Sequence, residues 1–149
     1  FNGTFYYGHE DGADSGGILV KVNTKTGETK LLMSNSLNGY APLFRNAIAY
    51  NGKLYFCGSV HVNGKSGLPS VYEIDPKDDS YKAVYVGLSS MQDYGAAYKK
   101  GISTGIRGMC VYNGKLVISN VFADATTGES GATILASSNP SEGFTVIAS

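Results

Sequence analysis

The chain repeats one hairpin motif, and this repeat limits its possible folds more than any other feature. Residues 45–56 match residues 107–118 around a central Asn-Gly pair, at an offset of 62 residues (107 − 45). Residues 1–7 match residues 50–56 at an offset of 49 (50 − 1), so a third copy starts in the middle of the motif. Asn and Gly both tolerate the positive φ of a type I′ turn. Each copy therefore predicts two antiparallel strands joined by a two-residue turn.

The second half of each repeat predicts another hairpin. Two β-rich runs flank a polar turn in every copy: 18–22 and 29–32 around 23–28, 71–74 and 80–86 around 75–79, and 133–136 and 144–148 around 137–143. The composition agrees, because 20 Gly and 11 Tyr against 4 Pro favour strands and tight turns over helices. A complete repeat therefore predicts four strands.

Four strands in repeats of this spacing are typical of β-propeller blades, which run to about 40–50 residues before loop insertions. Over nearly its whole length the chain resembles the β-propeller superfamily. No particular family is assigned, because the chain has no Trp and hence neither a WD dipeptide nor the kelch tryptophan. The predicted fold is all-β: about three consecutive four-stranded antiparallel blades of a propeller, at about residues 1–37, 38–99 and 100–149, with the first blade incomplete.

Charge and termini bear on partners and location. Lys plus Arg equals Asp plus Glu at 12 each, which argues against nucleic acid or an anionic membrane as partner. No apolar run approaches the roughly 20 residues of a membrane span. The chain starts at Phe1 rather than Met, as a processed or excised piece of a larger protein would. We expect part of a secreted or cell-surface propeller, completed by its remaining blades or by a second copy.

The two cysteines, Cys57 and Cys110, are compatible with free core thiols or with one disulfide. Their spacing matches no metal or redox motif, and free cysteine is often buried. We therefore expect two free, buried thiols.

Strands that run up and down place successive connections on opposite faces of a propeller. The Asn-Gly turns and the turns at 23–28 and 75–79 are short and share one face. The other face, here called the long-loop face, collects the loops predicted at 8–17, 58–70 and 122–132 within blades, and at 33–44 and 87–106 between them. Long loops on a rigid scaffold commonly carry binding sites.

Four residues are candidates for ligand binding on that face. Arg45 and Arg107 recur just before the innermost strand of their repeats, where a guanidinium suits a carboxylate or phosphate. Tyr40 and Tyr94 lie in the predicted inter-blade loops and suit stacking on a sugar. The alternative is structural: the arginines brace loops or pair with a neighbouring blade, and the tyrosines pack.

Neither a metal site nor a catalytic motif is predicted. The cluster at residues 9–14 holds a histidine and three carboxylates but lacks the calcium-loop pattern, so a solvated loop is the preferred interpretation. No cofactor is expected. The predicted function is a binding or interaction module that recognises a small polar ligand, glycan or protein on the long-loop face. Two alternatives stay open: a structural spacer, or a catalytic propeller, such as a glycoside hydrolase or lyase, using Asp11, Asp14 or Asp93 at the channel mouth.

Overall fold

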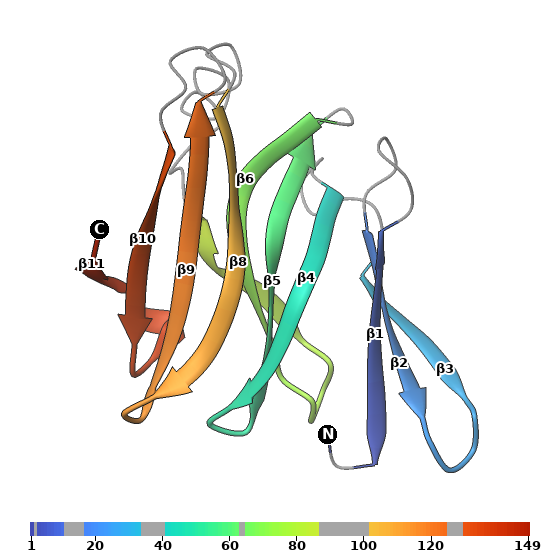
Figure 1. Cartoon of the computed structure of the whole chain (residues 1–149). Helices are drawn as coiled ribbons and strands as arrows, with labels where there is room; N and C mark the ends of the chain where they lie inside the picture. The colour runs from blue at the N-terminus through green and yellow to red at the C-terminus, as the bar shows by residue number, and fades with distance from the viewer. Residues whose placement is uncertain (2, 11–16, 34–40, 63–64, 87–101, 125–129) are drawn as a thin grey trace.

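The structure is a computed structural model, and it describes residues 1, 3–10, 17–33, 41–62, 65–86, 102–124 and 130–149. These residues form three antiparallel sheets (Figure 1). The predicted all-β fold is therefore confirmed. The predicted blade boundaries at 37/38 and 99/100 fall outside the described residues.

Each sheet is built from strands in sequence order. The first contains β1 (Thr4–Glu10), β2 (Gly17–Asn23) and β3 (Thr29–Met33). The second contains β4 (Ala41–Tyr50), β5 (Lys53–Val62), β6 (Lys65–Ile74) and β7 (Tyr81–Val86). The third contains β8 (Ile102–Tyr112), β9 (Lys115–Asp124), β10 (Ser130–Ser137) and β11 (Thr145–Ala148), with a short 3-10 helix, η1 (Pro140–Glu142), before the last strand. By repeat position, β4 and β8 are first strands, and β1, β5 and β9 are second strands.

The Asn-Gly turns adopt the predicted geometry. Asn51 and Asn113 both have φ 48°, and the glycines after them have φ 74° and 70°. These values belong to a type I′ turn, in which both central residues take positive φ. At the start of the chain Gly3 has φ 73°, although Asn2 lies outside the described residues. The three hairpin turns are therefore equivalent as far as they are described.

The turns after the third strands are equivalent as well. The Asn23 N–H donates to the Glu28 carbonyl and the Asp75 N–H to the Ser80 carbonyl, each at 2.9 Å. Gly27 (φ 73°) and Asp79 (φ 62°) occupy the same left-handed position in the two turns. Asp79 thus places a carboxylate where the first repeat has a glycine.

The strands extend further than the sequence predicts. The predicted loop 58–70 is wrong over most of its length, because β5 and β6 stay paired as far as Val62 and Lys65. The same holds for the ends of loops 8–17 and 122–132, whose flanking residues are paired, and for 41–44 and 102–106, which belong to β4 and β8. Glycine, serine and proline argue against strands locally, but pairing with a neighbouring strand outweighs that preference.

The sheets stack face to face around two apolar cores. Strand β4 contacts β1 and β2 of the first sheet, and β8 contacts β4, β5 and β6 of the second. The first core joins Leu19 and Met33 to Leu54, Phe56, Tyr72 and Ile74. The second joins Tyr50, Tyr55, Cys57 and Val71 to Ile106, Leu116, Ile118 and Leu135. In both interfaces the first strand of a later sheet covers the sheet before it.

Residues 54–57 are all buried because β5 is covered on both faces. Leu54 and Phe56 belong to the core toward the first sheet, whereas Tyr55 and Cys57 belong to the core toward the third. Alternate residues of a strand face opposite sides, so a strand between two layers reads as a continuous apolar run. Full burial of each such side chain contributes roughly 1.5–3 kcal/mol.

The cysteines differ in environment. Both are free, as expected, but Cys57 is buried and Cys110 is exposed. The expectation of two buried thiols was therefore wrong for Cys110. It lies opposite Val117, on the face of the third sheet that no described sheet covers.

Candidate functional site

Both arginines of the chain occupy the same kind of position (Figure 1, β4 and β8). The register of β4 against β5 shifts between Phe44 and Asn46, and Arg45 is the extra residue. The register of β8 against β9 shifts between Ile106 and Gly108, and Arg107 is the extra residue. A β-bulge of this kind turns one side chain out of the regular alternation. The two bulges occur at equivalent points of neighbouring first strands.

The bulges place the arginines inside strands rather than before them, which corrects the predicted location. The Arg107 side chain is exposed, and its guanidinium passes beside Gly105, where a Cβ would lie 3.6 Å from Nε and Cζ. Gly105 is nearer the start of β8. The guanidinium therefore extends along β8 toward the long-loop face.

The other candidates are described less fully. For Arg45 the backbone is described but the side chain is not, and Tyr40 and Tyr94 lie outside the described residues, as do Asp11, Asp14 and Asp93. Within the described part of the chain, Arg107 forms no ion pair. The sequence thus identifies one exposed arginine whose surroundings on the long-loop face stay a prediction.

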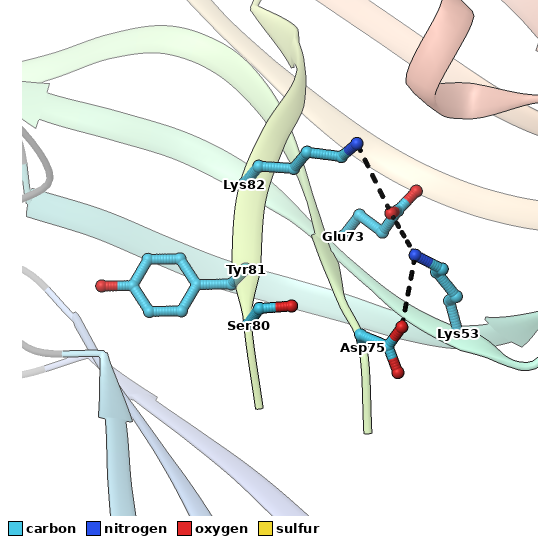
Figure 2. Close-up of a pocket in the computed structure, with 6 residues that line it drawn as sticks. All are labelled: Lys53, Glu73, Asp75, Ser80, Tyr81 and Lys82. Atoms are coloured by element: carbon cyan, nitrogen blue, oxygen red, sulfur yellow. Dashed lines mark hydrogen bonds and ion pairs between the residues drawn. The ribbon is translucent and has the colours of Figure 1, made fainter. Parts of the chain in front are cut away.

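A second polar cluster, which the sequence did not point out, lies near the opposite ends of the strands (Figure 2). It surrounds a pocket of about 180 Å³ lined by Lys53, Glu73, Asp75, Ser80, Tyr81 and Lys82. The Glu73 carboxylate accepts hydrogen bonds from Lys53 Nζ and Tyr55 Oη, both at 2.9 Å, and from Ser141 Oγ at 3.0 Å. Lys53 Nζ also lies 3.5 Å from Asp75 Oδ2.

These contacts keep Glu73 ionised although its side chain is only 4% exposed. Burial alone would raise the pKa of Glu73, but hydrogen bonds from Lys53, Tyr55 and Ser141 outweigh it and hold the pKa below its usual value. Burial and the hydrogen bond to Glu73 raise the pKa of Tyr55. The hydrogen bond to Glu73 raises the pKa of Lys53.

The pocket does not fit general acid catalysis. A catalytic acid in a glycosidase needs a raised carboxyl pKa, whereas the pKa of Glu73 is lowered. Lys53 bridges Glu73 and Asp75, so neither carboxylate faces an empty site. No group of three His, Cys, Asp or Glu side chains that could hold a metal ion occurs among the described residues. The cluster is therefore structural.

One feature of the sequence was available to identify this cluster. Glu73 is the one charged residue in the run Val71-Tyr72-Glu73-Ile74, and a charged residue in a buried strand normally has a partner. Its partner Ser141 lies 68 residues away in the third sheet, beyond the reach of any local pattern.

The comparisons leave function to the geometry: no family model matches the chain, and no curated protein matches it. No helix within the described ranges is long and apolar enough to cross a membrane.

Proposed function

We propose that the three sheets are consecutive blades of a β-propeller and that the protein is a binding module of a larger secreted or cell-surface protein. The ligand is a small polar molecule, a glycan or a protein, recognised on the long-loop face. The observation that carries this proposal is the repeated bulge, which holds both arginines of the chain at equivalent points of two neighbouring first strands.

The stacking of the sheets supports the propeller. Each later sheet lays its first strand across the sheet before it, β4 on β1 and β2, and β8 on β4, β5 and β6. A repeated unit that packs on its neighbour by the same interface generates a regular array, and radial repetition of four-stranded sheets is the propeller arrangement. The first strands are then the innermost strands, next to the channel.

The bulges support binding at the channel mouth. β-Bulges are over-represented beside functional sites because they redirect a side chain. The planar arginine fork binds carboxylate or phosphate through two parallel hydrogen bonds. Arg107 is exposed and has no ion-pair partner among the described residues, so its donors are available to a ligand.

Two substitutions test the proposal, Arg45→Ala and Arg107→Ala. We would screen neutral glycans, glycuronic acids, sugar phosphates and small carboxylic acids by calorimetry. Each substitution should weaken binding of the best anionic ligand by about 1–3 kcal/mol, the cost of losing a charged hydrogen bond. The melting temperature should stay nearly unchanged.

The matched control is Lys115→Ala, which removes an exposed cation beside the Asn-Gly turn at the opposite end of β9. It should leave affinity unchanged. If both arginine substitutions lower the melting temperature markedly and affinity across the panel stays unaltered, the arginines are structural and the site is elsewhere.

A further inference from the structure

One edge of the first sheet differs from the equivalent edges in the other two sheets. Strands β5 and β9 are each paired on both sides, with β4 and β6 and with β8 and β10. Strand β1 holds the same repeat position but pairs only with β2 among the described strands. Its other edge faces the place where the second and third sheets have a first strand (Figure 1).

The turn at the start of the chain shows which backbone groups face that edge. The Phe1 ammonium donates to the Thr4 carbonyl at 2.8 Å, and the Thr4 N–H donates back to the Phe1 carbonyl at 2.9 Å. Hydrogen-bonding direction alternates along an antiparallel strand. The N–H and C=O groups of Tyr6 and Gly8 therefore point to the free edge, and those of Phe5 and Tyr7 point to β2.

An apolar groove of about 230 Å³ runs beside this edge. Phe1, Phe5 and Tyr6 form one side, and Ala47, Ile48 and Ala49 of β4 form the other. The corresponding space between the second and third sheets lies between β5 and β8, and β4 occupies it, paired with β5 and in contact with β8. The groove is thus the position of a first strand.

We propose that this edge of β1 and the groove beside it bind an extended peptide as an added antiparallel strand. The peptide has the character of this repeat's own first strands, with a branched apolar residue between two small ones, as in Ala47-Ile48-Ala49. Main-chain hydrogen bonds to Tyr6 and Gly8 supply affinity, and side-chain fit in the groove supplies selectivity. The proposal rests on the sheet geometry and is independent of ligand binding at the arginines.

The register fixes which peptide residue enters the groove. In the second sheet Ile48 pairs with Tyr55, and the repeat places Tyr6 where that sheet has Tyr55. The residue opposite Tyr6 therefore points toward β4, as Tyr6 itself does in packing beside Phe56. The residues before and after it point away, to the face where Phe5 is 55% exposed.

A second copy of the chain is a poor occupant. Its two segments of this type, β4 and β8, are already paired with β5 and β9 in hairpins closed by two-residue turns. Releasing either would unfold a sheet that is buried against its neighbour. A free extended peptide carries no such cost beyond its own ordering.

The test uses the intact protein and a synthetic peptide with the sequence of residues 45–50, Arg-Asn-Ala-Ile-Ala-Tyr. Two versions are N-methylated at a single peptide bond, at the position of Ile48 or at that of Ala49. The N–H at Ile48 points to β1 in the proposed complex, whereas the N–H at Ala49 points away. Methylation at Ile48 should weaken binding about tenfold or more, and methylation at Ala49 less than about threefold, by fluorescence anisotropy.

Amide exchange followed by NMR locates the peptide. Its addition should slow exchange at Tyr6 and Gly8 and leave Phe5 and Tyr7, already directed at β2, nearly unchanged. Equal binding of the two methylated peptides, no binding at millimolar peptide, or no added protection at Tyr6 and Gly8 would each overturn the proposal. Protection of the same two amides without peptide, together with a dimer in sedimentation, would overturn it in favour of a second copy.

Discussion

Lys21 Nζ and Asp79 Oδ1 lie 2.7 Å apart and join the third strand of the first sheet to the turn after the third strand of the second. The same geometric tie recurs one sheet further along, where Ser141 Oγ donates to Glu73 Oε2 at 3.0 Å. Lys21 and Glu73 are equivalent, since they pair with the equivalent residues Tyr6 and Tyr55. The repeat thus conserves the position of the contact but exchanges its chemistry.

The first prediction concerns the ion pair at Asp79. Asp79→Asn keeps a residue that tolerates positive φ and removes the charge that meets both Lys21 and Lys30. Because Asp79 is only 12% exposed, we expect a loss of about 1–2 kcal/mol in the free energy of unfolding, measured with urea. Lys30→Ala is the control and should cost less than about 0.5 kcal/mol, since Lys30 is 61% exposed. Equal losses in the two variants would contradict this assignment.

Asp79 also predicts a pH dependence. Burial would raise its pKa, but hydrogen bonds from Lys21 and Lys30 outweigh burial and lower it. A carboxyl group whose folded pKa lies below its unfolded value stabilises the fold above the unfolded pKa and loses that contribution as pH falls through the folded value. Stability should therefore drop below about pH 4, and Asp79→Asn should flatten that part of the urea-denaturation profile. An unchanged acid profile would exclude Asp79 as a source.

Glu73 should matter more than any exposed charge. Glu73→Ala leaves the buried Tyr55 hydroxyl and the Lys53 ammonium without their acceptor, and we expect a loss of about 3–5 kcal/mol. Ser141→Ala, the milder control, removes one hydrogen bond and should cost about 1 kcal/mol. Both values come from urea unfolding. If Glu73→Ala costs no more than Ser141→Ala, the carboxylate is not the centre of the cluster.

The fourth prediction compares two equivalent tyrosines. The Tyr50 hydroxyl lies 2.7 Å from the Gly114 carbonyl and 3.0 Å from the Ser138 carbonyl, so it links the second sheet to the third. Tyr112 holds the same place in the next repeat and is 67% exposed. Tyr50→Phe should lower unfolding free energy by about 1 kcal/mol and Tyr112→Phe by almost nothing. A larger effect at Tyr112 would mean that a further sheet covers it.

The cysteines should differ in thiol reactivity. Cys110 is exposed and should react with a maleimide in the native protein. Burial raises the pKa of Cys57 to about 11, which leaves little thiolate at neutral pH, and the side chain is not accessible. Mass spectrometry should find one label on the folded chain, at Cys110, and two after unfolding in guanidinium. Rapid native labelling of Cys57 would show that the second core opens readily.

Local turn chemistry accounts for what could be predicted. Asn51-Gly52 and Asn113-Gly114 identified the hairpins because positive φ is a property of the residues themselves. The extent of the strands could not be predicted, since Gly58 and Pro69 are weak strand formers that hold their conformation through cross-strand pairing. The arginines stood out by recurrence, but their bulges depend on register. Glu73 stayed hidden because its partners come from two sheets.

The alternating chemistry of the inter-sheet ties has a consequence for the order in which similar repeats assemble. Were a second copy's middle sheet to stack on this one in place of the third sheet, its Asp79 would meet Glu73, and two carboxylates would face each other in a poorly hydrated site. In the native order Asp79 meets Lys21. At the same position the third sheet carries Ala136, which offers no charge to select a successor. The polar ties thus act as an address that discourages shuffled sheets, in a chain whose hairpins are otherwise nearly interchangeable.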